Sequence, residues 1–247
     1  MRIPRIYTPQ PLSADTSVAL DEQASHYVGR VLRMQGGRPL ILFNGEGGEF
    51  EAVISNVDKR EVLVDVGRFI ADERESPLHI HLGIGVSRGE RMDWVLQKAT
   101  ELGVSAITPL FTERCEVKLT GPRLEKKVQH WQQILTSACE QCQRNRLPQL
   151  HQPMKLDSWI GSLPEASDDH LRLVLHHRSE GRLQERSQPQ SAALVIGPEG
   201  GLSDAEINDC LQHHFSPLTL GPRVLRTETA PLTAISVLQY LWGDLAG

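Results

Sequence analysis

The sequence predicts an α/β protein in which a small β-rich module precedes a larger domain built on a parallel sheet. Three observations support this fold class. Short apolar runs around a glycine-rich turn occupy the first 70 residues, residues 71–77 are charged and end in proline, and apolar runs alternate with helical patterns from residue 78. A chain of 247 residues can hold one large domain of ~150–200 residues and a small module. We therefore expect domains at residues 1–70 and 78–247, joined by a linker at 71–77.

The first domain is expected to be a compact β-barrel. Residues 39–43 and 49–54 are strand-like runs on either side of residues 44–48, a turn with three glycines of the kind that closes a hairpin. A third run, residues 61–66, follows a polar turn. Short strands at this spacing are typical of a small barrel.

Basic residues cluster in two parts of an acidic chain. The net charge of -5 argues against a nonspecific nucleic-acid binder. Yet the first 38 residues contain five arginines and three acids, and residues 114–146 contain seven Lys and Arg and three acids. His26, Arg30 and Arg33 have the spacing i, i+4, i+7, which places them on one face of a helix. Such local faces favour a defined phosphate-bearing partner, with ordinary solvated arginines as the alternative.

The second domain reads as a doubly wound α/β domain. An amphipathic helix is expected at residues 93–102, and apolar residues in alternating steps of four and three predict a long helix at 124–142. Apolar runs bounded by turn residues predict at least five strands. These strands are expected at residues 79–86, 105–111, 171–175, 192–196 and 217–220.

Two glycine-bearing loops follow the last two predicted strands. Residues 197–201 read GPEGG and precede Ser203, which has the capping-box spacing to Glu206 that starts a helix. Residues 221–229 read GPRVLRTET and precede Pro231, which a helix tolerates in its first turn. Open α/β sheets bind ligands at the carboxyl ends of their strands, so we interpret these loops as a binding site. Ordinary turn glycines are the alternative.

The strings LVIGPEGGLSDAEI and LGPRVLRTETAPLTAISVLQY, which contain these loops, resemble the S-adenosylmethionine-binding motifs of SPOUT methyltransferases. The chain looks most like the 16S rRNA (uracil-N3)-methyltransferase family, from MRIPRIY to the last helix. The resemblance implies a PUA-like β-barrel for residues 1–70 and a SPOUT-type α/β domain with a trefoil knot for residues 78–247. It also implies the cofactor S-adenosyl-L-methionine, a uridine of 16S rRNA in the small ribosomal subunit as substrate, and a homodimer.

The resemblance further implies which residues form the site. The residues expected to bind the cofactor are Leu175, His176, Gly197, Pro198, Glu199, Gly200, Leu220, Gly221, Leu225, Thr227, Thr229 and Ala230. The basic residues expected to contact RNA are Arg2, Arg5, His26, Arg30, Arg33, Arg88, Arg114 and Arg144. Family members often carry lysine within residues 87–90, where this chain has Arg88, which keeps the charge but changes the geometry.

Methyl transfer to uridine N3 needs help from the protein, because this nitrogen carries a proton and is a poor nucleophile until the proton leaves. A base, or a cation that stabilises the uridine anion, meets this need. Arg226 and Glu228 are the polar candidates on the second loop. We expect Arg226 to stabilise the anion and Glu228 to act as a positioning group or base. The alternative is that Glu228 only holds the loop, or caps the last helix with Thr229.

Other chemistries are disfavoured. Residues 83–89 read GIGVSRG, but Arg88 stands where a dinucleotide loop has its third glycine, and no P-loop motif occurs. Cys139 and Cys142 form a C-x-x-C inside a predicted helix and lack a second pair. We therefore predict packed cysteines, surface histidines and no metal.

The chain is expected to work in the cytoplasm. No apolar run approaches the ~20 residues that span a membrane, and the start has no apolar signal core. An alternative function is a noncatalytic RNA-binding ribosome assembly factor on the same fold, but intact cofactor loops favour the enzyme. A tRNA or ribose target is a third possibility, against which the barrel and the full-length resemblance argue.

Overall fold

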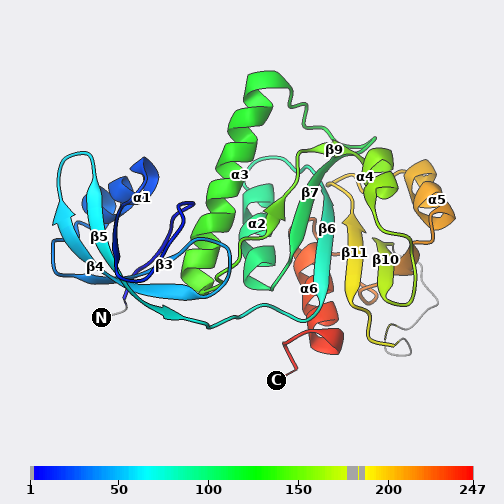
Figure 1. Cartoon of the computed structure of the whole chain (residues 1–247). Helices are drawn as coiled ribbons and strands as arrows, with labels where there is room; N and C mark the ends of the chain where they lie inside the picture. The colour runs from blue at the N-terminus through cyan, green and yellow to red at the C-terminus, as the bar shows by residue number, and fades with distance from the viewer. Residues whose placement is uncertain (1–2, 177–182, 184–186, 247) are drawn as a thin grey trace. The chain divides into compact units, whose positions relative to one another are not determined.

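The computed structural model describes residues 3–176, 183 and 187–246, and it divides into two compact units (Figure 1). The first unit comprises the chain up to residue 75 together with residues 136–147, and the second comprises residues 76–135 and the chain from residue 148 onward. The predicted domains differ from these units, because residues 136–147 belong to the first unit.

Five strands form the sheet of the first unit. Its order is β1-β3-β4-β5-β2, in which β1 runs parallel to β3 and the other pairs are antiparallel. The fully buried side chains Ile6, Val28, Leu42, Ile54 and Val64 form its core. β1 and β2 were not predicted, because runs this short show no clear alternation. The strands are β1 (Arg5–Tyr7), β2 (Thr16–Ala19), β3 (Pro39–Phe43), β4 (Glu49–Val57) and β5 (Val62–Ile70).

The predicted helix face of His26, Arg30 and Arg33 is wrong. Helix α1 (Glu22–His26) continues into one π-helical turn, η1 (Tyr27–Val31), in which the Leu32 N–H donates to the Tyr27 carbonyl at 2.9 Å. Arg33 lies beyond it with a φ of 51°. The wider π turn and the left-handed residue change the direction of successive side chains, so the i, i+4, i+7 spacing does not hold.

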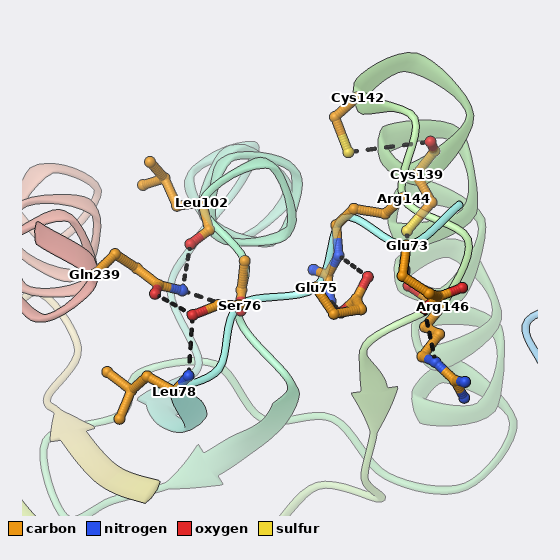
Figure 2. Close-up of polar contacts among 11 residues, drawn as sticks. Glu73, Glu75, Ser76, Leu78, Leu102, Cys139, Cys142, Arg144, Arg146 and Gln239 are labelled. Atoms are coloured by element: carbon orange, nitrogen blue, oxygen red, sulfur yellow. Dashed lines mark hydrogen bonds and ion pairs between the residues drawn. The ribbon is translucent and has the colours of Figure 1, made fainter. Parts of the chain in front are cut away.

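The predicted linker, residues 71–77, is largely bonded into the first unit (Figure 2). Arg144 donates from Nε to Glu75 Oε1 at 3.0 Å and from Nη2 to Glu75 Oε2 at 2.5 Å, and its side chain is only 4% exposed. Arg146 Nε donates to Glu73 Oε2 at 3.0 Å. The bidentate pairing of Arg144 with Glu75 offsets the cost of removing these two charges from water. These contacts join residues about 70 positions apart, which a local pattern does not reveal.

The second unit is built on a parallel sheet of order β12-β10-β11-β6-β7-β8, with β9 also paired to β7. β11 therefore lies between two strands that precede it in the chain. All five predicted strands are present, and the two-residue strands β8 and β9 are additional. The strands are β6 (His79–Gly85), β7 (Ala106–Phe111), β8 (Gln149–Leu150), β9 (Met154–Lys155), β10 (His170–Leu175), β11 (Ser191–Ile196) and β12 (Ser216–Leu218).

Helices cover both faces of this sheet (Figure 1). One apolar core contains residues of α2, α3 and α6, and the other contains residues of α4 and α5. The predicted long helix and the Ser203–Glu206 capping box are both confirmed, whereas the short α4 was not predicted. Among the helices that the described residues form, none is long and apolar enough to span a membrane. The helices are α2 (Arg91–Glu101), α3 (Gly121–Cys142), α4 (Leu156–Ser162), α5 (Asp204–Gln212) and α6 (Thr229–Trp242).

A buried amide fastens the start of the second unit to its last helix. Gln239 on α6 is fully buried, and its Oε1 accepts from Ser76 Oγ at 2.6 Å, as Figure 2 shows. Its Nε2 donates to the Leu102 carbonyl at 3.0 Å. Ser76 Oγ in turn accepts from the Leu78 N–H at 3.1 Å. This network satisfies buried polar groups on three segments that would otherwise be costly to remove from water.

His81 on β6 is not a surface histidine, contrary to the prediction from the sequence. Its Nε2 accepts from Trp159 Nε1 at 3.1 Å and lies 2.8 Å from Thr108 Oγ1. Burial, and secondarily the nearby His151, lower the pKa of His81 from 6.5 to about 4. The imidazole is therefore neutral at physiological pH and is part of the packing between β6 and α4.

Mild acid should destabilise the second unit through His81. The unfolded chain binds more protons than the folded one between pH 6.5 and about 4. The free energy of unfolding should therefore fall as the pH drops through this window, by about 3 kcal/mol at most. Urea unfolding followed by tryptophan fluorescence measures this, because all four tryptophans belong to the second unit.

The variant His81→Gln keeps an acceptor for Trp159 but does not titrate, so it should show a flatter pH dependence than the wild type. His79→Gln is the matched control, because His79 is an exposed residue of the same strand. Equal pH dependence in wild type and His81→Gln would contradict the assignment.

Candidate functional site

The carboxyl ends of four neighbouring strands meet at one edge of the second unit's sheet. β12, β10, β11 and β6 are adjacent and parallel, and they end at Leu218, Leu175, Ile196 and Gly85. The residues predicted for cofactor binding and catalysis lie at the end of β10, in the segments that follow β10, β11 and β12, and in the first turn of α6. The sheet thus brings the starts of the two predicted glycine-bearing loops to the same edge as the end of β10.

The first loop, residues 197–201, is tightly folded against the end of β6. The Gly201 N–H donates to the Pro198 carbonyl at 2.8 Å, and Gly201 has a φ of 69°. A Cβ atom on Gly197 would lie 2.6 Å from Leu202 N, and one on Gly85 would lie 2.4 Å from Pro198 N. Only glycine permits these approaches, so the turn glycines have a specific structural role here.

The second loop, residues 219–228, leads into α6. Gly221 has a φ of 78°, and the Arg226 carbonyl accepts from the N–H groups of Thr229 and Ala230 at 2.9 Å each. Glu228 precedes the first residue of α6, but its side chain makes no capping hydrogen bond. The alternative in which Glu228 caps this helix is therefore wrong. Pro231 lies in the first turn, as predicted.

The end of β10 joins the second loop through main-chain and side-chain hydrogen bonds. The His176 N–H donates to the Leu218 carbonyl at 2.9 Å, and Thr219 Oγ1 donates to the His176 carbonyl at 3.0 Å. Leu175, Leu220 and Leu225 are half-buried and pack against the core. These aliphatic side chains place apolar surface at the end of β10 and along the second loop.

Arg91, at the start of α2, contacts acidic side chains from both glycine-bearing loops. Its Nη1 donates to Glu199 Oε1 at 2.8 Å, and its Nε is 3.8 Å from Glu228 Oε2. Sequence reasoning missed Arg91. The available signal was a cation two residues before the helix predicted at residues 93–102, near the helix N-terminus where the dipole disfavours positive charge.

The Glu199 carboxylate has several donors. Partial burial would raise its pKa, but the backbone N–H groups of Arg88 and Glu199 and the guanidinium of Arg91 outweigh this, and the pKa is lowered. The Arg88 N–H donates to Glu199 Oε1 at 2.9 Å. Glu199 is therefore ionised and fixed in place at neutral pH.

Arg226 and Glu228 differ in their surroundings. The Arg226 side chain is exposed and has no hydrogen-bond or ion-pair partner among the described residues. Glu228 is half-buried beside Arg91. The edge of the sheet therefore presents a cation that is available to bind an anion, and a carboxylate that is held in place.

Two family models match this chain, an RNA methyltransferase domain over residues 74–239 and an RNA methyltransferase PUA domain over residues 20–67. Ribosomal RNA small subunit methyltransferase E of Buchnera aphidicola subsp. Schizaphis graminum is 36% identical over 99% of both chains. The Bacillus subtilis protein of the same name is 31% identical, over 94% of this chain and 93% of its own. The chain belongs to the ribosomal RNA small subunit methyltransferase E family.

Solved structures agree with this assignment. A methyltransferase from Legionella pneumophila, in complex with bound SAM, is 48% identical with a TM-score of 0.95, over 99% of this chain and 100% of its own. The ribosomal RNA small subunit methyltransferase E of Neisseria gonorrhoeae, bound to S-adenosyl methionine, is 35% identical with a TM-score of 0.91 over the same shares. The α/β fold with a PUA-like first domain, predicted from the sequence, is confirmed.

Two of the arginines predicted to bind RNA in this family member are structural. Arg5 pairs with the buried carboxylate of Glu49, donates to Asn145 Oδ1 at 2.5 Å and lies over the Phe43 ring. Arg144 is held by Glu75, as described above. Both guanidinium groups are buried and neutralised, so they cannot reach a phosphate. Arg2 lies outside the described residues.

Arg114 and Arg88 lie close to the first loop. Arg114 Nη1 donates to the carbonyls of Gly200 and Leu202 at 3.1 and 3.2 Å, and so supports the loop from outside. Arg88 pairs with Glu116 on the surface. Arg114 therefore has a structural role that its place in a basic segment did not reveal.

His26 and Arg30 line a hollow of about 620 Å³ on the first unit. Lys59 and Arg60, from the turn between β4 and β5, line it too, and Arg30 Nη2 donates to the Lys59 carbonyl at 3.3 Å. Arg33 is exposed but does not line the hollow. In the part of the chain that the structure describes, no His, Cys, Asp or Glu side chains form a metal-binding group.

The close approach of β6 to the first loop leaves no room for a side chain at Gly85. Gly85→Ala should lower the free energy of unfolding by about 1–3 kcal/mol, because its Cβ would meet backbone and ring atoms of Pro198. Gly161→Ala in α4 is the matched control, since its Cβ would have no neighbour within 4 Å. Urea unfolding measures both variants, and equal stability of the two would refute the steric argument.

Proposed function

We propose that this protein transfers a methyl group from S-adenosyl-L-methionine to N3 of a uridine in 16S rRNA of the small ribosomal subunit. The observation that carries the proposal is the pair of glycine-bearing loops at the ends of β11 and β12, the two strands that flank β10 in the sheet. It occurs in a chain whose solved relatives, 48% and 35% identical, bind S-adenosylmethionine. The uridine N3 target rests on the family resemblance of the motifs.

The loops fit this cofactor. Gly197 lets the turn close tightly on Gly201 and Leu202, and Gly201 has nothing within 4 Å of the place where a Cβ would stand, which leaves that side of the first loop open to a ligand. Leu175, Leu220 and Leu225 supply apolar surface beside them. Concave sites of this kind combine apolar walls with a few fixed polar groups. When bound, the cofactor supplies an electrophilic methyl group on a sulfonium.

The chain's own residues would prepare the uridine. Arg226 is exposed on the second loop and can stabilise the anion that remains when the N3 proton leaves. Glu228 would accept that proton or orient the base, and Arg91 holds its carboxylate in place. Alignment of N3 with the methyl group contributes the remaining rate enhancement. A base at N3 is needed because the neutral imide nitrogen is a weak nucleophile.

The first unit would hold the RNA outside the reacting nucleotide. His26, Arg30, Lys59 and Arg60 line the hollow and are all exposed, so they are available to phosphates, although Glu22, Asp58 and Glu61 line it as well. Arg33 and Arg88 are also exposed and stay in this proposal. Arg5 and Arg144 are excluded from the proposed RNA contacts because their guanidinium groups are buried.

We also propose a homodimer, a cytoplasmic location and the trefoil knot that the family resemblance implies. α2 and α6 pack together and expose Trp94 and Tyr240, 52% and 64% respectively, which are aromatic contacts suited to a second copy. The placement of β11 between β10 and β6 supports a threaded chain. A ribosomal substrate supports the cytoplasmic location.

Calorimetric titration with S-adenosylmethionine and methylation of unmodified small subunits together test the function. The wild type should bind and methylate. Gly200→Trp should lose binding, because even a Cβ there would lie 3.1 Å from Arg114 Cβ.

Glu228→Gln should bind the cofactor normally but lose at least ~10-fold in turnover if the carboxylate is the base. Unchanged turnover would end the base role. A folded wild type that binds no cofactor would favour the noncatalytic RNA-binding factor.

RNA binding at the hollow of the first unit predicts a separate effect on the RNA substrate. Arg30→Gln and Arg60→Gln, in one double variant, should raise KM for the small subunit severalfold and reduce the salt dependence of binding. Cofactor affinity should not change. Arg68→Gln is the matched control, because Arg68 is an exposed arginine of β5 that pairs with Glu51 and does not line the hollow. An unchanged KM in the double variant would contradict RNA binding there.

A further inference from the structure

Arg91 connects two loops that are distant in the sequence. Glu199 lies in the first loop, and Glu228 lies immediately before α6. The guanidinium of Arg91 donates to Glu199 at 2.8 Å through Nη1 and places Nε 3.8 Å from Glu228. One side chain on α2 therefore contacts both walls of the candidate cofactor site.

The position of Arg91 explains why it needs both carboxylates. It is the first residue of α2, at the positive end of the helix dipole, where a cation is unfavourable by itself. A planar guanidinium carries donors that point in different directions, so it can serve two acceptors at once. Glu199 is also held by the Arg88 N–H, which anchors one end of the arrangement to the main chain.

We propose that Arg91 is a positioning residue that sets the separation of the two cofactor loops and the orientation of Glu228. The proposal rests on the proposed function, because it takes these loops as the cofactor site. Arg91 itself would touch neither the methyl group nor the uridine. It would act through Glu199, which moves with the first loop, and through Glu228, which moves with the start of α6.

The contrasting reading is an ordinary surface ion pair. The side chains of Arg91, Glu199 and Glu228 are 43%, 32% and 26% exposed, so their pairing adds little to global stability. A positioning role therefore predicts a specific pattern. Loss of Arg91 should change cofactor affinity and loop mobility, while the melting temperature stays close to that of a matched control.

Arg91→Met is the main variant, because it removes the charge and keeps an apolar stem. Lys127→Met is the matched control. Lys127 lies on α3, and its Nζ pairs at 3.0 Å with Asp93 of α2, the helix that carries Arg91, but it contacts neither loop. We expect Arg91→Met to bind S-adenosylmethionine about 10-fold more weakly, equivalent to about 1.4 kcal/mol. The control should bind like the wild type. Arg91→Lys should be intermediate, because an ammonium cannot span both carboxylates.

Double variants separate coupling from independent losses. Arg91→Met combined with Glu199→Gln, or with Glu228→Gln, should weaken binding by less than the product of the single effects. A folded Arg91→Met that binds like the wild type would overturn the proposal. So would multiplicative losses in both double variants.

Hydrogen exchange without cofactor distinguishes failure of this inference from failure of the proposed function. If the wild type binds no S-adenosylmethionine, the proposed function fails, but exchange still tests the positioning role. Arg91→Met should exchange faster than Lys127→Met in peptides covering residues 197–203 and also in those covering residues 226–230. Faster exchange in fewer than both segments would overturn the proposal.

Discussion

The candidate site depends on the central position of β11. This strand pairs in parallel with β6 on one side and β10 on the other, and both of its faces are buried, with Leu194 and Ile196 in one core and Val195 in the other. Parallel pairing brings the carboxyl ends to one edge, and packing on both faces prevents the strand from shifting register. The loop after β11 consequently starts beside the end of β10, at the same edge as the loop that follows β12.

The two glycine-bearing loops are held in different ways. The first is fixed by its own turn, by steric contact with the end of β6 and by Arg114, which donates to the carbonyls of Gly200 and Leu202. The second exposes its tip, where Val224 is 98% exposed, and is held at its ends by the bonds to His176 and by the first turn of α6. One wall of the site is thus rigid, and Arg91 connects it to the other. This arrangement suits a reaction that depends on alignment.

Arginine has three distinct roles in this chain, and the surroundings decide which one. Arg144 is buried against Glu75 and holds residues 71–75 to the segment after α3. Arg114 is a donor to loop carbonyls, and Arg30 lines an exposed hollow. All three have the same charge, but only an arginine without a buried partner retains its charge for RNA phosphates. Charge counts along the sequence therefore overestimate the RNA-binding surface.

The sequence by itself determined the α/β class, the five main strands of the second unit, the capping box of α5 and the two glycine-bearing loops. These features depend on periodicity and turn chemistry within a few residues, which local sequence carries. Only the tertiary structure decided that residues 136–147 join the first unit, that His81 packs against Trp159 and that Arg91 bridges Glu199 and Glu228. Each of these depends on partners that lie far apart in the chain, and the order of strands and the packing of helices bring such partners together.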